Sequence, residues 1–172
     1  VHIGLYAPHW PPADGANGIV SYVASVRDYL VTQGHLVSVI SQRTIHSSDG
    51  MKVALAALAN HPSLLARAVR RIRRWFDRKP GALNWLGHEL ASDLACAHRI
   101  RPFDIIEMEE SFGWSAIVGR RLDVPIVTRL HGPLCLKPVG MRSAGQVRDD
   151  EARCEAEARA VREARLLTAP TR

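Results

Sequence analysis

Apolar and polar residues alternate in blocks along the first forty positions. Residues 1–6 and 36–41 are short apolar runs of the length of a buried strand. Between them, a loop rich in proline and glycine at 8–18 leads into residues 19–30, where apolar side chains recur every three or four positions. Gly34 stands where a left-handed residue would end a helix. This pattern predicts a strand, a loop, a helix and a second strand.

Similar blocks continue to the end of the chain. Helical stripes of apolar residues predict further helices at 64–76, 83–99, 114–122 and 146–165. Short apolar runs predict further strands at 105–108, 126–130 and 166–169. Residues 42–61 show no clear period, although 51–59 could form a short helix. Strands that alternate with helices predict an α/β fold, a Rossmann-like doubly wound parallel sheet covered by helices on both faces.

The loops at the carboxyl ends of the strands are where such a sheet binds its ligands. Four loops are expected to meet at that edge, at 7–18, 42–50, 109–112 and 131–145. The functional residues of the chain are therefore expected in these loops.

Length and composition are typical of one globular domain, because the chain has 172 residues of which 47% are hydrophobic. Its apolar runs fall far short of the roughly 20 residues needed to span a bilayer, and no leader of charged and then apolar residues opens it. The cysteines, Cys96, Cys135 and Cys154, are odd in number and form no Cys-x-x-Cys pair. These features favour a cytoplasmic protein with reduced thiols.

The positive charge of the chain is concentrated in one segment. Residues 61–80 contain seven Arg or Lys residues and one Asp, so this segment alone carries a charge of +6, which equals the net charge of the whole chain. The helix predicted there places Arg70, Arg71 and Arg74 opposite its apolar stripe, with Trp75 near one end. Such a helix is typical of one that lies on an anionic membrane surface. A solvated face of an ordinary surface helix is an equally good interpretation, and nucleic acid is a weaker one.

The loop at 14–18 reads Asp-Gly-Ala-Asn-Gly and leads directly into the first predicted helix. A glycine at a helix start lets a phosphate approach the N–H groups without meeting a Cβ. A plain Gly/Asn turn that caps the helix is an equally good interpretation. NAD binding is disfavoured, because the loop is not Gly-x-Gly-x-x-Gly and the second strand ends at Ser41-Gln42 without an acidic residue for the ribose.

Two other loops at the same expected edge carry ionisable side chains. His131 follows one strand, where an imidazole could exchange hydrogen bonds or protons with a ligand. Glu109 and Glu110 follow another, beside aromatic residues that include Phe112, and this combination suits a hydroxyl-rich ligand. Each feature also has a structural interpretation: a histidine that only serves the fold, or a glutamate that caps the following helix.

Taken in order, these segments resemble the N-terminal domain of retaining GT-B glycosyltransferases. The resemblance is to the family-four, or group 1, branch that includes bacterial mannosyl- and glucosyltransferases, and it covers nearly the whole chain. Its strength lies in the order and spacing of the motifs. The matching segments are 17–23 with 33–40, against a family opening of the form GGI…YV…L…GHEVTVIT; 103–107, against PDVVH; 121–132, against LGVPVVTTLHG; and 155–171, against E…..AD.VTAPS.

The resemblance implies that residues 1–172 are the acceptor-side half of a GT-B fold, with the donor-binding C-terminal domain beyond Arg172 and no activity in this half alone. It implies transfer of a hexose from a nucleotide-diphosphate sugar to a glycan or lipid-linked acceptor, with no cofactor and no metal. The expected protein is a cytoplasmic enzyme of bacterial polysaccharide biosynthesis, peripheral on the inner membrane face where its basic helix meets anionic lipid.

The resemblance also assigns roles by position. Gly18, with Asn17 before it, would bind the donor diphosphate, and His131 would be the catalytic residue beside the transferred sugar. The acceptor pocket would be lined by Glu110, Phe112, His9 and Trp10.

The chain departs from the family pattern at two places. Asn17 replaces the first glycine of the usual pair, and asparagine tolerates the left-handed conformation that such a turn can need. Glu107 and Glu109 stand where histidines are common, so acceptor selectivity does not carry over.

Two functions of other classes stay open. One is a stand-alone, non-catalytic domain that binds a glycan or a protein partner, and a second Rossmann-like half after Arg172 would argue against it. The other is a nucleotide- or NAD-binding oxidoreductase domain, which the missing acidic residue after the second strand disfavours.

Overall fold

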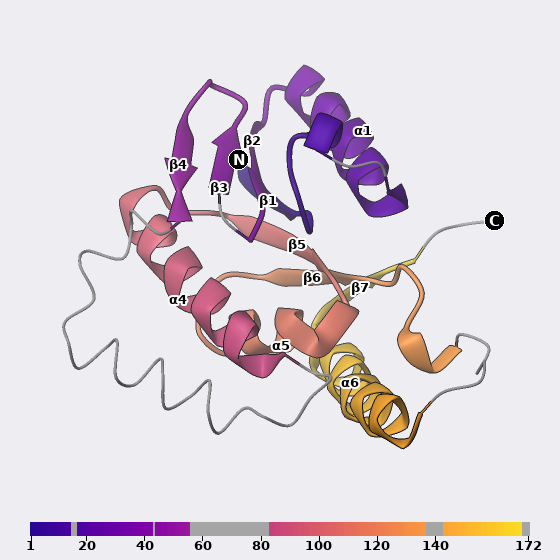
Figure 1. The fold of residues 1–172 in the computed structure, drawn as a ribbon. Coiled ribbons are helices and arrows are strands. Elements are labelled where there is room, and N and C mark those ends of the chain that lie inside the picture. The colour runs from indigo at the N-terminus through magenta and orange to yellow at the C-terminus, as the bar shows by residue number, and fades with distance from the viewer. Residues whose placement is uncertain (15–16, 43, 56–82, 137–142, 170–172) are drawn as a thin grey trace.

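The computed structural model of the chain describes residues 1–14, 17–42, 44–55, 83–136 and 143–169 (Figure 1). Its centre is a seven-stranded sheet with the strand order β4-β3-β2-β1-β5-β6-β7. The strands are β1 (His2–Tyr6), β2 (Leu36–Ile40), β3 (Thr44–Ser47), β4 (Lys52–Ala54), β5 (Ile105–Glu109), β6 (Ile126–Arg129) and β7 (Leu166–Thr168). The helices are α1 (Gly18–Thr32), α4 (Asn84–Ile100), α5 (Trp114–Gly119) and α6 (Ala144–Glu163), with short 3-10 turns η1 (Pro12–Asp14), η2 (Ser111–Gly113) and η3 (Leu134–Leu136).

The parallel part of the sheet runs from β2 through β1, β5 and β6 to β7. Helices connect these strands and cover both faces, so the predicted α/β, Rossmann-like architecture is confirmed. Outside residues 42–61, each strand and helix predicted within the described residues is found close to its expected bounds. The helix predicted at 64–76 lies outside the described residues.

The edge of the sheet beside β2 differs from the prediction. β3 pairs antiparallel with β2, and β4 pairs antiparallel with β3, so residues 44–54 form a hairpin. A helix over 51–59 is therefore wrong for Lys52–Ala54, while 56–59 lie outside the described residues. Tertiary pairing decides this segment, because β3 buries Ile45 and Ser47 against the sheet, and Gly50, with φ of 89°, makes the reversal.

Helix α1 covers one face of the sheet, and α4, α5 and α6 lie on the other (Figure 1). One hydrophobic layer lies beneath α1 and a second beneath α4 and α5. Val23 of α1 belongs to the first layer, together with Leu5 and Val39 of the sheet. Ile106 and Met108 of β5 belong to the second layer. Because successive side chains of a strand point to opposite faces, the intervening glutamates of β5 point to the α1 side of the sheet.

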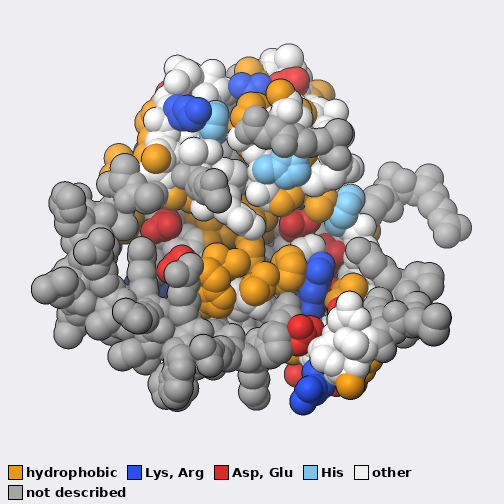
Figure 2. Space-filling view, in the orientation of Figure 1, with side chains coloured by type: hydrophobic (Ala, Val, Ile, Leu, Met, Phe, Trp, Pro, Cys, Tyr) orange, Lys and Arg blue, Asp and Glu red, His pale blue; other side chains and the backbone are white. Residues whose placement is uncertain are grey.

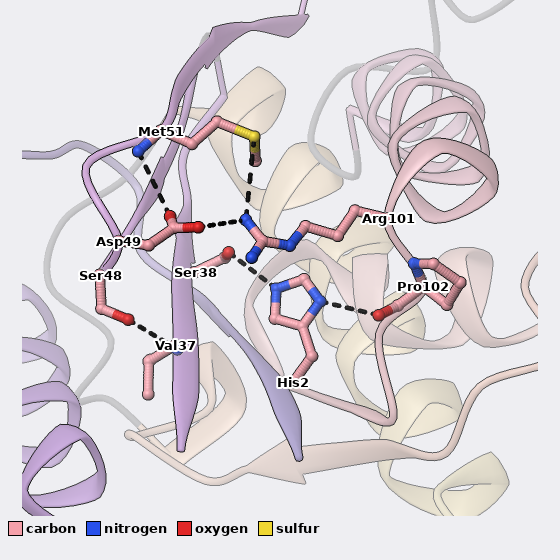
Figure 3. Close-up of polar contacts among 8 residues, drawn as sticks. All are labelled: His2, Val37, Ser38, Ser48, Asp49, Met51, Arg101 and Pro102. Atoms are coloured by element: carbon pink, nitrogen blue, oxygen red, sulfur yellow. Dashed lines mark hydrogen bonds and ion pairs between the residues drawn. The ribbon is translucent and has the colours of Figure 1, made fainter. Parts of the chain in front are cut away.

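The amino-terminal end of β1 is tied to its surroundings through His2 (Figure 3). His2 Nδ1 lies 2.7 Å from the carbonyl oxygen of Pro102, and Nε2 lies 2.8 Å from Ser38 Oγ. A carbonyl oxygen only accepts, so Nδ1 carries the proton and Nε2 accepts from the Ser38 hydroxyl. The ring also stacks on Phe103, with 4.5 Å between centroids.

The turn of the β3–β4 hairpin is held at the same end of the sheet (Figure 3). Arg101, just after α4, donates to Asp49 at 2.7 Å, and the Arg101 guanidinium is the main reason that the pKa of Asp49 falls to about 2. Ser48 Oγ accepts the backbone N–H of Val37 at 3.1 Å. These contacts brace the hairpin at the edge opposite the carboxyl ends of the strands.

Folding stability is expected to fall on acidification because of His2. Burial lowers its pKa below the value of 6.5, so the native state binds fewer protons than the unfolded chain. The stabilisation is complete above pH 6.5 and is lost as the pH falls. In urea titrations at pH 7 and pH 5, the difference in unfolding free energy between the wild type and His2→Phe should narrow by at most about 1.4 kcal/mol per pH unit. A difference that stays constant would contradict this assignment.

Candidate functional site

The carboxyl ends of β1, β5 and β6 lie side by side, and we call the loops that follow them (7–14, 110–113 and 130–136) the carboxyl rim. Figure 2 shows histidine and acidic side chains gathered on this face between α1 and α6. Of the loop predicted at 42–50, Gln42 lies at this end of the sheet, two residues after β2 ends and hydrogen-bonded to Tyr6, whereas residues 44–50 lead away from it. Residues 44–47 form β3, and Ser48 donates its backbone N–H to Val37, at the opposite end of β2.

The start of α1 and the loop after β6 meet at the carboxyl rim. A Cβ built on Gly18 would lie 3.5 Å from Cε1 and 3.8 Å from Nε2 of His131. The imidazole therefore rests against the first turn of α1. Two of the segments that the sequence predicts to converge, at Asn17-Gly18 and at His131, are brought together in the structure.

Asn17 is the N-cap of α1, and its Oδ1 accepts the backbone N–H of Val20 at 2.9 Å. Its backbone is extended, with φ of −147°, so the left-handed conformation that asparagine would tolerate is not used. The N–H groups of Gly18 and Ile19, which follow the cap, have no carbonyl partner within the helix. Together with the positive end of the helix dipole they suit an anionic ligand.

Glu110 holds the loop that carries His131. Its Oε2 accepts the backbone N–H of His131 at 2.8 Å, and its Oε1 accepts that of Gly132 at 2.9 Å. The side chain is only 1% exposed, so both carboxylate oxygens are engaged inside the fold. In this structure Glu110 positions the histidine loop, and contact with an acceptor stays a prediction.

A second buried glutamate, Glu157 of α6, joins two loops of the rim. Its carboxylate accepts the N–H of Phe112 at 3.2 Å and that of Leu134 at 2.6 Å, and Arg153 donates to it at 2.6 Å. The sequence interpretation missed Glu157. The signal for it is the spacing of Ala156, Glu157 and Ala160, which are all buried on one side of a helix that otherwise reads as charged.

The aromatic candidates lie on the same rim. Phe112 has a positive φ of 57°, and its half-buried ring carries the Arg153 guanidinium 3.9 Å above its centroid. Trp10 is half-buried and packs against the hydrophobic layer beneath α1, and His9, also half-buried, precedes it. Contacts of Phe112, His9 and Trp10 with an acceptor stay predictions.

Ion pairing at the end of β5 brings in Arg129, to which the sequence interpretation gave no role. Arg129 donates to Glu107 at 2.7 Å, and the two side chains are almost buried. Glu109 is 7% exposed. Burial is the largest cause that raises the pKa of Glu109 to about 7, the neighbouring Glu110 adds to the rise, and the charge of Arg129 opposes it.

Some predicted features lie beyond what the structure describes. Arg70, Arg71, Arg74 and Trp75 fall within 56–82, outside the described residues, so the membrane-facing helix stays a prediction. In the described ranges, no cluster of three or more His, Cys, Asp or Glu side chains could hold a metal ion. Nor does any helix there have the length and apolar character needed to cross a membrane.

Comparison with known families finds one match over most of the chain. The family model described as Glycosyltransferase Family 4 matches residues 16–172. Searches of curated proteins and of solved structures find no significant match.

Glu110→Gln should destabilise the protein by about 2–3 kcal/mol, because a glutamine amide offers one acceptor oxygen where two backbone N–H groups are buried. Glu163→Gln is the matched control, since Glu163 pairs with Arg120 at an exposed site and should cost less than about 1 kcal/mol. Urea titration of both variants measures the difference. Equal losses would show that Glu110 does not hold the loop.

Proposed function

The chain belongs to Glycosyltransferase Family 4, and we propose that it forms the N-terminal, acceptor-side half of a retaining GT-B enzyme. The proposed reaction transfers a hexose from a nucleotide-diphosphate sugar to a glycan or lipid-linked acceptor. The second half of the enzyme would be a C-terminal domain that holds most of the nucleotide sugar. The observation that carries the proposal is the meeting of the α1 amino terminus with His131 at the carboxyl rim.

The donor diphosphate would bind at the start of α1. Transfer displaces a nucleoside diphosphate from the anomeric carbon, so negative charge grows on the leaving phosphate. The N–H groups of Gly18 and Ile19 and the helix dipole would lower the energy of that charge. No cofactor or metal is part of the proposal.

His131 would act beside the transferred sugar. Its imidazole rests against Gly18, so a phosphate at the start of α1 would bring the attached sugar close to it. The ring could exchange hydrogen bonds with sugar hydroxyls at neutral pH. Glu110 serves this role indirectly, because it holds the backbone of His131 and Gly132.

The acceptor would approach from the loops that follow β1 and β5. His9, Trp10 and Phe112 lie on these loops and offer ring faces and a polar imidazole, which suit a sugar acceptor. A lipid-linked acceptor would bring the enzyme to a membrane, where Arg70, Arg71 and Arg74 would face anionic lipid. Co-sedimentation with anionic and with neutral liposomes tests that location.

A donor screen on the full-length protein tests the proposed function. UDP-, GDP- and ADP-hexoses are incubated with and without glycan or lipid-linked acceptors, and release of nucleoside diphosphate is measured. One donor should be consumed, the product should keep the anomeric configuration of the donor by NMR, and His131→Ala should abolish turnover. Binding of a glycan without consumption of any donor would favour a non-catalytic binding domain instead.

Two substitutions at Gly18 are expected to differ in the complete enzyme. A Cβ there would make an ordinary contact of 3.5 Å with His131 but would also stand beside the N–H groups proposed to receive the phosphate, so Gly18→Ala should lower kcat/KM by less than Gly18→Val does. The γ-carbons of Gly18→Val would press on the imidazole and crowd a bound phosphate. The value of kcat/KM for the nucleotide sugar should fall at least tenfold, about 1.4 kcal/mol. Near-normal kinetics of the valine variant would remove the phosphate role from this turn.

A further inference from the structure

The helix α1 contacts the end of β6 at two levels. Gly18 and Tyr22 are four residues apart and share one face of α1. His131 rests against Gly18, and Arg129, which closes β6, stacks its guanidinium 4.1 Å from the centre of the Tyr22 ring. One helical turn along α1 from the candidate phosphate site, Tyr22 and Arg129 therefore form a second contact between α1 and β6.

This second contact also includes β5. Arg129 Nη1 donates to Glu107 Oε1 at 2.7 Å, and the Tyr22 hydroxyl donates to Glu107 Oε2 at 3.4 Å. A helix and two neighbouring strands are thus joined by one nearly buried guanidinium, whose side chain is 5% exposed. The cation–π and ion-pair contacts both depend on where that guanidinium lies.

Among the described residues, the Arg129 guanidinium is hydrogen-bonded on one side only. Within the part of the chain that the structure describes, its Nε and Nη2 are buried and make no hydrogen bond, and the same holds for Oε2 of Glu109. Glu109 is the register partner of Arg129 on the adjacent strand and lies on the same face of the sheet. A buried donor pair and a buried acceptor therefore stand unused as neighbours, which is costly for both.

The protonation state of Glu109 decides whether Arg129 is attracted to it or stays with Glu107 and Tyr22. Glu110 and Ser111 face it from its own strand end, Arg129 from β6, Arg153 from α6 and Tyr6 from β1. Burial and Glu110 favour the neutral carboxyl, while Arg129, Ser111 and Arg153 favour the carboxylate, and the resulting pKa is about 7. Below that pH Glu109 is neutral and Arg129 stays with Glu107 and Tyr22. Above it the carboxylate attracts the free side of the guanidinium.

We infer that Glu109 and Arg129 are positioning residues of the carboxyl rim: a proton on Glu109 leaves Arg129 on Tyr22 and Glu107 and so seats the start of α1 beside His131. Loss of the proton draws Arg129 toward Glu109 and loosens the first two turns of α1. The effect on catalysis rests on the proposed function, whereas the contact itself does not.

Hydrogen–deuterium exchange on the full-length protein tests the contact without a substrate. Amide protection of residues 20–24, corrected for the intrinsic effect of pH, should fall at least fivefold between pH 6 and pH 8. Glu109→Gln, which is neutral at both values and close in shape, should keep the high protection at both. A parent protein without the pH response, or a Glu109→Gln protein that retains it, overturns the inference.

Two further variants sharpen this test. Asp49→Asn alters another carboxylate paired with an arginine, at the far end of the sheet and with a pKa of about 2, so it should behave as the parent. Arg129→Lys keeps the charge but lacks the planar guanidinium that stacks on Tyr22 while it donates to Glu107, so its pH response should be lost. An unaltered response in Arg129→Lys, or a lost one in Asp49→Asn, contradicts the inference. If Arg129→Lys does not fold, Glu109→Gln still decides it.

Kinetics then connect the contact to the reaction. In the full-length enzyme kcat should fall about tenfold from pH 6 to pH 8 with little change in KM for the donor, and Glu109→Gln should remove this limb of the pH profile. If the enzyme transfers sugar but the Glu109→Gln variant still shows the fall in kcat from pH 6 to pH 8, the inference is overturned and the proposed function stands. If the amide protection of α1 depends on pH in the parent but not in Glu109→Gln, and no donor is consumed, the inference is supported and the proposed function is refuted.

Discussion

The arrangement of the rim depends on the buried carboxylate of Glu110. A carboxylate removed from water is tolerated only when its oxygens are hydrogen-bonded, and here the partners are the backbone N–H groups of His131 and Gly132. This requirement fixes the loop after β6 to the end of β5. Because the loop cannot move without stranding a buried charge, the imidazole of His131 keeps its place against α1.

A second buried carboxylate also accepts backbone N–H groups of the rim. Glu157 of α6 binds the N–H groups of Phe112 and Leu134, so the turn after β5 and the segment after β6 share one carboxylate. The approach of α6 is close, since a Cβ on Gly113 would lie 2.4 Å from the carbonyl oxygen of Ala156. These loops are therefore fixed by the close packing of α6 and by two buried carboxylates, which gives the rigidity that a binding rim needs.

Hydrophobic periodicity was sufficient to predict the parallel strands and their helices, because most of them bury an apolar stripe; β7 followed from its apolar run alone, since its three residues are exposed. It failed at β3 and β4, whose short polar strands are defined by pairing with β2 and not by their own pattern. The convergence of Gly18 and His131 followed from topology, since loops after parallel strands share an edge. The partners of Glu110 and Glu157 could not be predicted, because backbone N–H groups have no sequence signature. The contact of Tyr22 with Arg129 could not be predicted either, because it depends on how α1 is oriented about its own axis on the sheet.

The end of β5 shows how one strand can bring three carboxylates into a buried place. Glu107 is neutralised by Arg129, and Glu110 by backbone N–H groups, so each has its own source of compensation. Glu109 comes last in this division: Arg129 donates through Nη1 to Glu107 and stacks on Tyr22, and its remaining donors, Nε and Nη2, are buried without a hydrogen bond among the described residues. A third negative charge at this site would lie beside Glu110 without full compensation, so the protonated form of Glu109 persists to near neutral pH. The crowding that stabilises the histidine loop is therefore also what makes one of its neighbours sensitive to protons.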